Sequence, residues 1–207
     1  MDGVVIRASV PIVSFRPYLS RDYQDTHPVP PPSTVFGMLL SLCGITEAVR
    51  SDFQCTELAI MVDRVRQPSR VLRKLRRDSS TDQRQGRVGY RPDYQELILG
   101  LQAWVAVRQG DARRDLSDRV QDALARPEKL DRYGALSLGE STFLVDEIAD
   151  CDSAPPGGIV LHPEDTGSLT LPVWVDYKDP SVTRLQRFSL VERELTEDDY
   201  VQVKPGG

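Results

Sequence analysis

The sequence predicts an α+β fold, in which one mixed domain is followed by a small β-rich extension. Three observations favour this class. The chain has 207 residues, 40% of them hydrophobic, which is enough for an ordinary core and an appendage. Its first 150 residues alternate strand-like apolar segments with two helical patterns. After a cluster of structure breakers, CDSAPPGG, the segments that follow are strand-like.

The domain begins with a predicted strand and a short helix. Residues 4–13 are β-branched and partly alternating, which predicts a strand that ends at Pro11 or soon after it. The loop 14–32 closes with consecutive prolines, which hold the chain extended. We expect Ser33 to cap a short, mostly buried helix that stops at Gly44.

Two more strands, a second helix and a fourth strand complete the predicted domain. Residues 57–65 and 94–108 are rich in Leu, Ile and Val, which predicts the second and third strands. In 115–125 the apolar residues are spaced four apart and Asp115 stands near the start, which predicts an amphipathic helix. Residues 141–148 predict the fourth strand.

The order strand, helix, strand, strand, helix, strand is that of split βαβ domains such as the ferredoxin-like and RRM-like folds. We therefore assign residues 1–150 to a ferredoxin-like, RRM-like domain. Residues 151–207 are assigned to a C-terminal β-rich extension that packs onto it.

The composition argues against several classes of protein. No apolar run approaches the ~18 to 20 residues that span a bilayer, and the first residues lack the cations of a signal peptide, so we expect a cytoplasmic protein without membrane contact. The three cysteines show no CxxC spacing, which favours buried thiols. With two histidines in the chain, we expect neither a metal site nor a cofactor.

A basic segment between the second and third strands is the strongest functional signal. From Arg64 to Arg91 it has ten cations and two carboxylates, a local charge of +8 in a chain of net charge −5. Arginine suits RNA because its planar fork pairs phosphates and stacks on bases. We predict a protruding hairpin at about residues 66–93, although a solvated basic face is the alternative. Its candidate RNA contacts are Arg64, Arg66, Arg70, Arg73, Lys74, Arg76, Arg77, Arg87, Tyr90 and Arg91.

Two further sets of candidate RNA contacts are weaker signals. The first surrounds the start of the first helix, where free backbone N–H groups suit a phosphate. Its members are Arg16, Arg21, Tyr23, Ser33 and Thr34. The second is the turn with Gly139 and Ser141, which lacks the Lys-Ser or Lys-Thr of a nucleotide-binding P-loop. An ordinary helix entry and an ordinary turn are the alternatives.

Four motifs in sequence order resemble the fifth family of CRISPR-associated (Cas) proteins, and more narrowly its DevS-like branch. They are PVPPPSTVFGMLLSLCG, SRVLRKLRR, RPDYQELILGL and YGALSLGESTFLVDEI, which lie within residues 4–148. The resemblance implies a member of the RAMP superfamily, with an RRM-like core and a thumb hairpin between the second and third strands. It identifies the segment 64–91 as the thumb and places the Ser33 helix and the turn at 139–141 near the RNA.

The resemblance also implies a role. Such a subunit caps the backbone of a type I Cascade complex and holds the 5′ handle of the crRNA. Its expected partners are the crRNA, the Cas seven-type backbone subunit, the Cas eight-type large subunit and, through the complex, the target DNA.

Two alternatives differ in class. One branch of the family cleaves precursor crRNA without a metal, using a tyrosine and adjacent lysine and histidine residues. Neither His27 nor His162 has a lysine neighbour, so we predict that this chain is not an enzyme. The second alternative is a protein interaction module whose basic hairpin binds an acidic partner without RNA.

Overall fold

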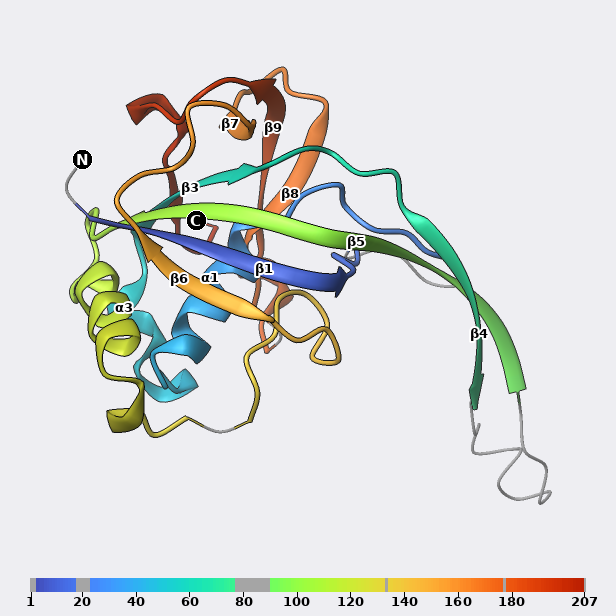
Figure 1. Ribbon diagram of the computed structural model, residues 1–207, viewed down its shortest axis with the longest axis horizontal. Coiled ribbons are helices and arrows are strands. Elements are labelled where there is room, and N and C mark those ends of the chain that lie inside the picture. Colours follow the sequence, from blue (N-terminus) through green and yellow to red (C-terminus); the bar gives the residue numbers. More distant parts are fainter. Residues whose placement is uncertain (1–2, 18–22, 77–89, 133, 177, 207) are drawn as a thin grey trace.

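The computed structural model describes residues 3–17, 23–76, 90–132, 134–176 and 178–206. Over these residues the chain forms a mixed α/β fold with few helices and a ten-stranded, mostly antiparallel sheet network (Figure 1). The first strand, β1 (Val4–Val13), is rich in β-branched residues, which pack well on a pleated surface.

Four strands form the first part of the sheet. They are β1 (Val4–Val13), β3 (Thr56–Val62), β5 (Tyr90–Arg108) and β6 (Glu147–Cys151), in the antiparallel order β6-β1-β5-β3. This is the strand order of a split βαβ unit, and the bounds predicted for the first strand are confirmed.

The predicted fourth strand was placed too early. β6 begins at Glu147, whereas the residues before it form a turn in which the Phe143 N–H donates to the Glu140 carbonyl at 3.0 Å. Ser137 and Leu144 make an isolated bridge there. The residues before Glu147 that resemble a strand in sequence belong to this turn. The hydrogen-bonded pairing with β1 therefore begins only at Glu147.

The C-terminal strands extend the same sheet. β7 (Ile159–Pro163) pairs with β3, followed by β9 (Arg184–Glu192) and β8 (Leu169–Trp174), and β10 (Val201–Val203) also pairs with β3. Backbone hydrogen bonds therefore join these strands directly to the first part of the sheet, and the domain boundary near residue 150 stays a prediction.

Two α-helices pack on the sheet within the described part of the chain, α3 (Leu116–Ala125) against β1 and β5, and α1 (Pro32–Leu42) against β3 and β10. The two helices lie together in Figure 1, and α1 also packs against β8. Short 3-10 helices connect the other elements: η1 (Glu47–Phe53), η2 (Pro127–Lys129), η3 (Pro180–Val182) and η4 (Glu197–Asp199).

The structure confirms the predicted start of α3 at Asp115, whereas the predicted capping residue of α1 was wrong. Asp115 caps α3, because its carboxylate accepts the Ser117 N–H at 2.8 Å. The cap of α1 is Pro31 and not Ser33. Pro32 takes the first helical position, where its fixed φ and missing N–H are tolerated, so both the cap and the helix start lie two residues earlier than predicted and Ser33 lies in the first turn.

The core contains an irregularity at Gly100. Gly100 has φ +68° and lies opposite Pro11, and the alternation of buried residues skips a position there. Ile98 and Leu101 consequently both belong to the main buried core. Leu99, which follows Ile98, pairs with Ile12 on β1. Both lie at the surface, with Leu99 49% exposed and Ile12 42% exposed.

No single helix in the described ranges is long and apolar enough to cross a membrane. Only α1 together with η1 meets the criteria of length and composition, and these two helices meet at a bend of 118°.

Candidate nucleic-acid interface

A two-stranded arm projects from the body of the molecule (Figure 1). We define the arm as β4 (Ser69–Arg76) and the paired part of β5, with antiparallel pairs from Ser69 opposite Leu97 to Arg76 opposite Tyr90. The third strand therefore begins four residues before its predicted start. Three predicted contacts, Arg21, Arg77 and Arg87, lie outside the described residues.

The arm presents arginine side chains near its base. The side chain of Arg70 is 68% exposed, and its Nε donates to Glu96 at 3.3 Å. Arg73 donates a hydrogen bond to the side chain of Gln95. For Lys74, Arg76, Tyr90, Arg91 and Tyr23, which are all predicted contacts, the structure describes the backbone in β4, β5 and β2 (Tyr23–Gln24).

Arg64 and Arg66 differ in their exposure and in how closely they pair with Asp63. Arg66 makes a bidentate pair with Asp63, at 2.6 and 2.8 Å, and its side chain is only 14% exposed. Burial alone would raise the pKa of Asp63, but hydrogen bonding and charge from Arg66 hold that pKa below its ordinary value. Arg64 is 74% exposed and lies 3.9 Å from Asp63. Of these two predicted contacts, Arg64 presents the more accessible guanidinium.

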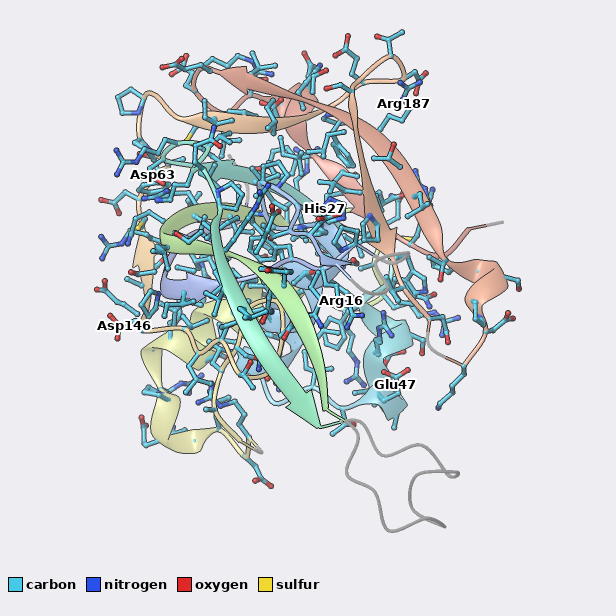
Figure 2. All side chains as sticks on the ribbon, turned by 90° about the vertical axis from the view of Figure 1, so that its right-hand side faces the viewer. Arg16, His27, Glu47, Asp63, Asp146 and Arg187 are labelled. Carbon is cyan, nitrogen blue, oxygen red and sulfur yellow. The ribbon has the colours of Figure 1, made fainter. Side chains whose placement is uncertain are left out.

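A pocket of about 710 Å³ lies at the start of α1. It brings together four predicted residues from three separate segments: Arg16, Ser33, Thr34 and Gly139. Ser141 is exposed but does not line the pocket. Figure 2, which views the molecule from the side toward which the arm projects, labels Arg16.

The pocket also contains four charged residues that the sequence analysis missed: Glu47, Arg50, Asp131 and Arg132. They come from η1 and from the segment after η2, which pack beside α1 only in the folded chain. No local pattern in the sequence marks them. The pocket therefore carries both signs of charge, and its guanidinium groups suit phosphates while its carboxylates suit donors on bases or ribose.

Two glycines permit the close packing of the pocket walls. Gly139 has φ +85°, and a Cβ there would lie 2.5 Å from the Ser14 carbonyl oxygen. Gly44 has φ +65°, and a Cβ there would lie 2.6 Å from the Asp131 carbonyl oxygen. Residues with side chains would force both walls apart, so the width of the pocket depends on these positions.

Arg50 of the pocket is held by contacts with Trp174 and Val175. Its guanidinium lies 4.1 Å from the centre of the Trp174 ring, and Nη2 donates to the Val175 carbonyl at 3.0 Å. The Trp174 ring in turn packs on Phe36 of α1, with the ring centres 5.9 Å apart. Stacking and hydrogen bonding together give Arg50 one orientation.

The histidines lie elsewhere. Burial lowers the pKa of His27, and His162 Nδ1 lies 2.9 Å from the Asp199 carboxylate. The described residues that line the pocket include no histidine and no lysine. Across the described ranges, no group of three His, Cys, Asp or Glu residues is placed to hold a metal ion.

The family is decided by comparison with known sequences. The family model described as CRISPR-associated protein (Cas_Cas5) matches residues 3–187. The chain belongs to the Cas5 family. A curated relative from Myxococcus xanthus (strain DK1622), CRISPR-associated protein Cas5, is 33% identical over 189 residues, which cover 88% of this chain and 87% of the relative.

Solved structures share the fold of this Cas5-family chain. A chain of a structure described as a CRISPR RNA-guided surveillance complex has a TM-score of 0.60 at 18% identity, over 94% of this chain and 91% of the other. A crystal structure of a Cas protein has a TM-score of 0.51 at 16% identity, over 98% of both chains. The family match extends into β9, well beyond the stretch 4–148 in which the sequence motifs lie.

Proposed function

We propose that this Cas5-family chain is a non-catalytic subunit of a type I Cascade complex that holds the 5′ handle of the crRNA. In this proposal it caps one end of the complex, with the arm as its thumb. The observation that carries the proposal is the pocket at the start of α1, which collects Arg16, Ser33, Thr34 and Gly139 beside the base of the arginine-bearing arm.

The physical chemistry of the two parts is complementary. A pocket of about 710 Å³ is large enough for a nucleotide. The start of α1 carries the positive end of the helix dipole, which favours a phosphate beside Arg16. The arm then offers arginines along the path of a single strand, where phosphate pairing and stacking do not depend on sequence.

The proposal includes protein partners. In it the chain assembles with a backbone subunit, a large subunit and, through them, the target DNA. The chain of a CRISPR RNA-guided surveillance complex that has the same fold supports assembly into a complex of this kind. Exposed apolar residues such as Leu99 and Ile12 offer surface for such neighbours. A subunit of this kind acts in the cytoplasm, in antiviral defence or RNA-guided DNA targeting.

Binding of a labelled 5′-handle RNA, measured by fluorescence anisotropy over a salt titration, tests the proposal. We expect Arg16→Gln to weaken binding and to reduce the log–log salt slope by about 0.7 for the lost phosphate contact. Charge reversal at Arg76 and Arg77 has a larger effect of the same kind. Arg113→Gln removes an exposed charge outside the pocket and serves as the control.

The results separate the three functional hypotheses. Equal affinity and equal slope in all variants would refute the RNA-binding proposal, and tight binding of an acidic protein in place of RNA would favour the interaction module. Incubation with labelled repeat RNA without metal tests catalysis. We expect intact RNA, whereas specific cleavage that is lost in His27→Ala would establish the ribonuclease.

A further inference from the structure

The base of the arm contains two buried polar side chains on β5. Gln95 is 1% exposed and Glu96 is 8% exposed, although both residue types usually lie at the surface. β2 pairs in parallel with β5 at this point, so the base has three strands, whereas the arm beyond it has the pair β4 and β5. Each of the two side chains connects β5 to other segments.

Gln95 connects the arm to one wall of the pocket. Its side-chain oxygen accepts from Arg73 on β4, and its Nε2 donates to the Glu140 carboxylate at 3.0 Å. Glu140 directly follows Gly139, which lines the pocket and packs on the backbone of Ser14. A single buried amide thus bridges β4 and the turn that shapes the pocket.

Glu96 connects the arm to the segment that leads into the pocket residue Arg16. Its Oε1 accepts from Arg70 Nε at 3.3 Å and its Oε2 accepts from the Thr26 N–H at 3.4 Å. Thr26 in turn accepts the Phe15 N–H through Oγ1 at 2.8 Å, and Phe15 precedes the pocket residue Arg16. The second bridge therefore ends one residue before Arg16, whose guanidinium we propose holds RNA.

We propose that Gln95 and Glu96 fix the direction of the arm relative to the pocket, so that one RNA strand contacts both. They are positioning residues, because their burial keeps them from the RNA itself. A two-stranded ribbon is marginally stable alone and twists readily, so its direction is set where it joins the body. Both bridges include a charged partner and lie partly out of water, which strengthens their hydrogen bonds. The inference rests on the proposed function.

The expected effect on RNA follows from the population of the correct arm direction. If loss of a bridge leaves the arm correctly directed for about one tenth of the time, the apparent Kd for handle RNA rises about tenfold. This loss occurs without removal of any RNA-contacting group. The salt slope therefore stays close to that of the wild type, which distinguishes a positioning residue from a phosphate contact.

Electron paramagnetic resonance measures the distance between two spin labels. Applied to the full chain without RNA, it tests whether the arm keeps one direction relative to the body. Spin labels are placed at Leu72→Cys on the arm, which is 60% exposed, and at Asp118→Cys, which is exposed on α3. The partly buried Cys55 and Cys151 are replaced by alanine. We expect a narrow distance distribution in this background and a clearly broader one in Gln95→Met, which keeps the length of the side chain and removes both hydrogen bonds.

Gln102→Met is the matched control. Gln102 also lies on β5, and its Nε2 donates to the Ser9 hydroxyl at 2.7 Å within the body of the sheet. The control keeps the narrow distribution and the wild-type affinity. An equally narrow distribution in Gln95→Met and Gln102→Met would overturn the inference.

A second variant covers the possibility that Gln95→Met does not fold. Glu140→Ala removes the far end of the same bridge at a half-buried turn position, and we expect a broader distribution there too. Failure of the proposed function has a different signature. A wild-type arm that is narrow in distance but binds no handle RNA refutes RNA binding, and the inference falls only if the bridge variants leave the arm unchanged.

Discussion

Replacement of Gly139 by alanine is expected to destabilise the protein and deform the pocket. Gly139 has φ +85°, a conformation that costs an alanine about 1–2 kcal/mol relative to glycine. The new Cβ would also lie 2.5 Å from the Ser14 carbonyl oxygen, and relief of such a contact costs about 1–3 kcal/mol. The total for Gly139→Ala is therefore about 2–5 kcal/mol.

Gly134 provides a matched control for the backbone term. It has φ +79°, and no atom lies within 4 Å of the position of its Cβ. Gly134→Ala therefore meets the conformational penalty of about 1–2 kcal/mol without the clash. The difference between the two variants isolates the close approach of the turn to Ser14.

Urea unfolding followed by circular dichroism measures this difference. With a slope of about 3 kcal/mol per molar urea, a difference of about 2 kcal/mol separates the two midpoints by about 0.7 M. We also expect weaker handle binding in Gly139→Ala alone, because the turn that lines the pocket must move. Equal midpoints and equal affinities in the two variants would refute the packing that we describe.

Three further predictions concern the core and its ionisable groups. Burial raises the pKa of Cys43 to about 12, so iodoacetamide at pH 8 is expected to modify this thiol only after unfolding, as read by mass spectrometry; modification at the unfolded rate would contradict its burial. Asp199 is buried, which by itself raises its pKa, but two hydrogen bonds of 2.6 Å from Arg193 help to hold the pKa below its ordinary value. The carboxylate therefore stabilises the fold at neutral pH, and this stability is lost as the pH falls below about 4. Asp199→Asn should lower the free energy of unfolding by about 3 kcal/mol at pH 7 and flatten its dependence on acid pH, and an unchanged profile would argue against the pairing. Phe36→Ala, at a fully buried position against Trp174, should cost about 3–5 kcal/mol in urea unfolding, and a loss below that of an exposed substitution would show that the helix packs differently.

Elements that are marked by neighbouring residues in the sequence were predicted correctly. The first strand and α3 with its Asp115 cap follow from alternation, helical spacing and a capping residue, and the structure confirms them. The strand order also follows, since a split βαβ unit leaves few ways to connect its elements.

The errors arose where two local signals competed. Ser33 is a good capping residue, but Pro32 is an equally good first helical residue, and the helix starts with the proline. Residues 143–145 are apolar and were predicted to lie in a strand, yet they belong to the turn that follows Gly139. Sequence patterns do not decide between such signals, because the decision depends on packing against β1.

Only some of the residues that line the pocket could be predicted, because the others reach it through contacts between distant parts of the sequence. Arg16, Ser33, Thr34 and Gly139 stood in segments with recognisable signals, whereas Arg50 enters the pocket only through its contacts with Trp174 and Val175 on the C-terminal part of the sheet. These contacts span more than 120 residues of sequence. The bridging role of Gln95 was hidden too, because a glutamine within a strand is unremarkable until its neighbours are known.

The unbroken course of β5 through both arm and core constrains how the arm can vary between relatives. Side chains alternate along a strand, so one residue inserted near Leu97 would turn every outer residue of the arm to its opposite side. Two inserted residues would leave the sides unchanged and lengthen the arm by about 7 Å. We therefore expect homologous arms to differ in length by even numbers of paired residues, with odd differences confined to the connection at the tip.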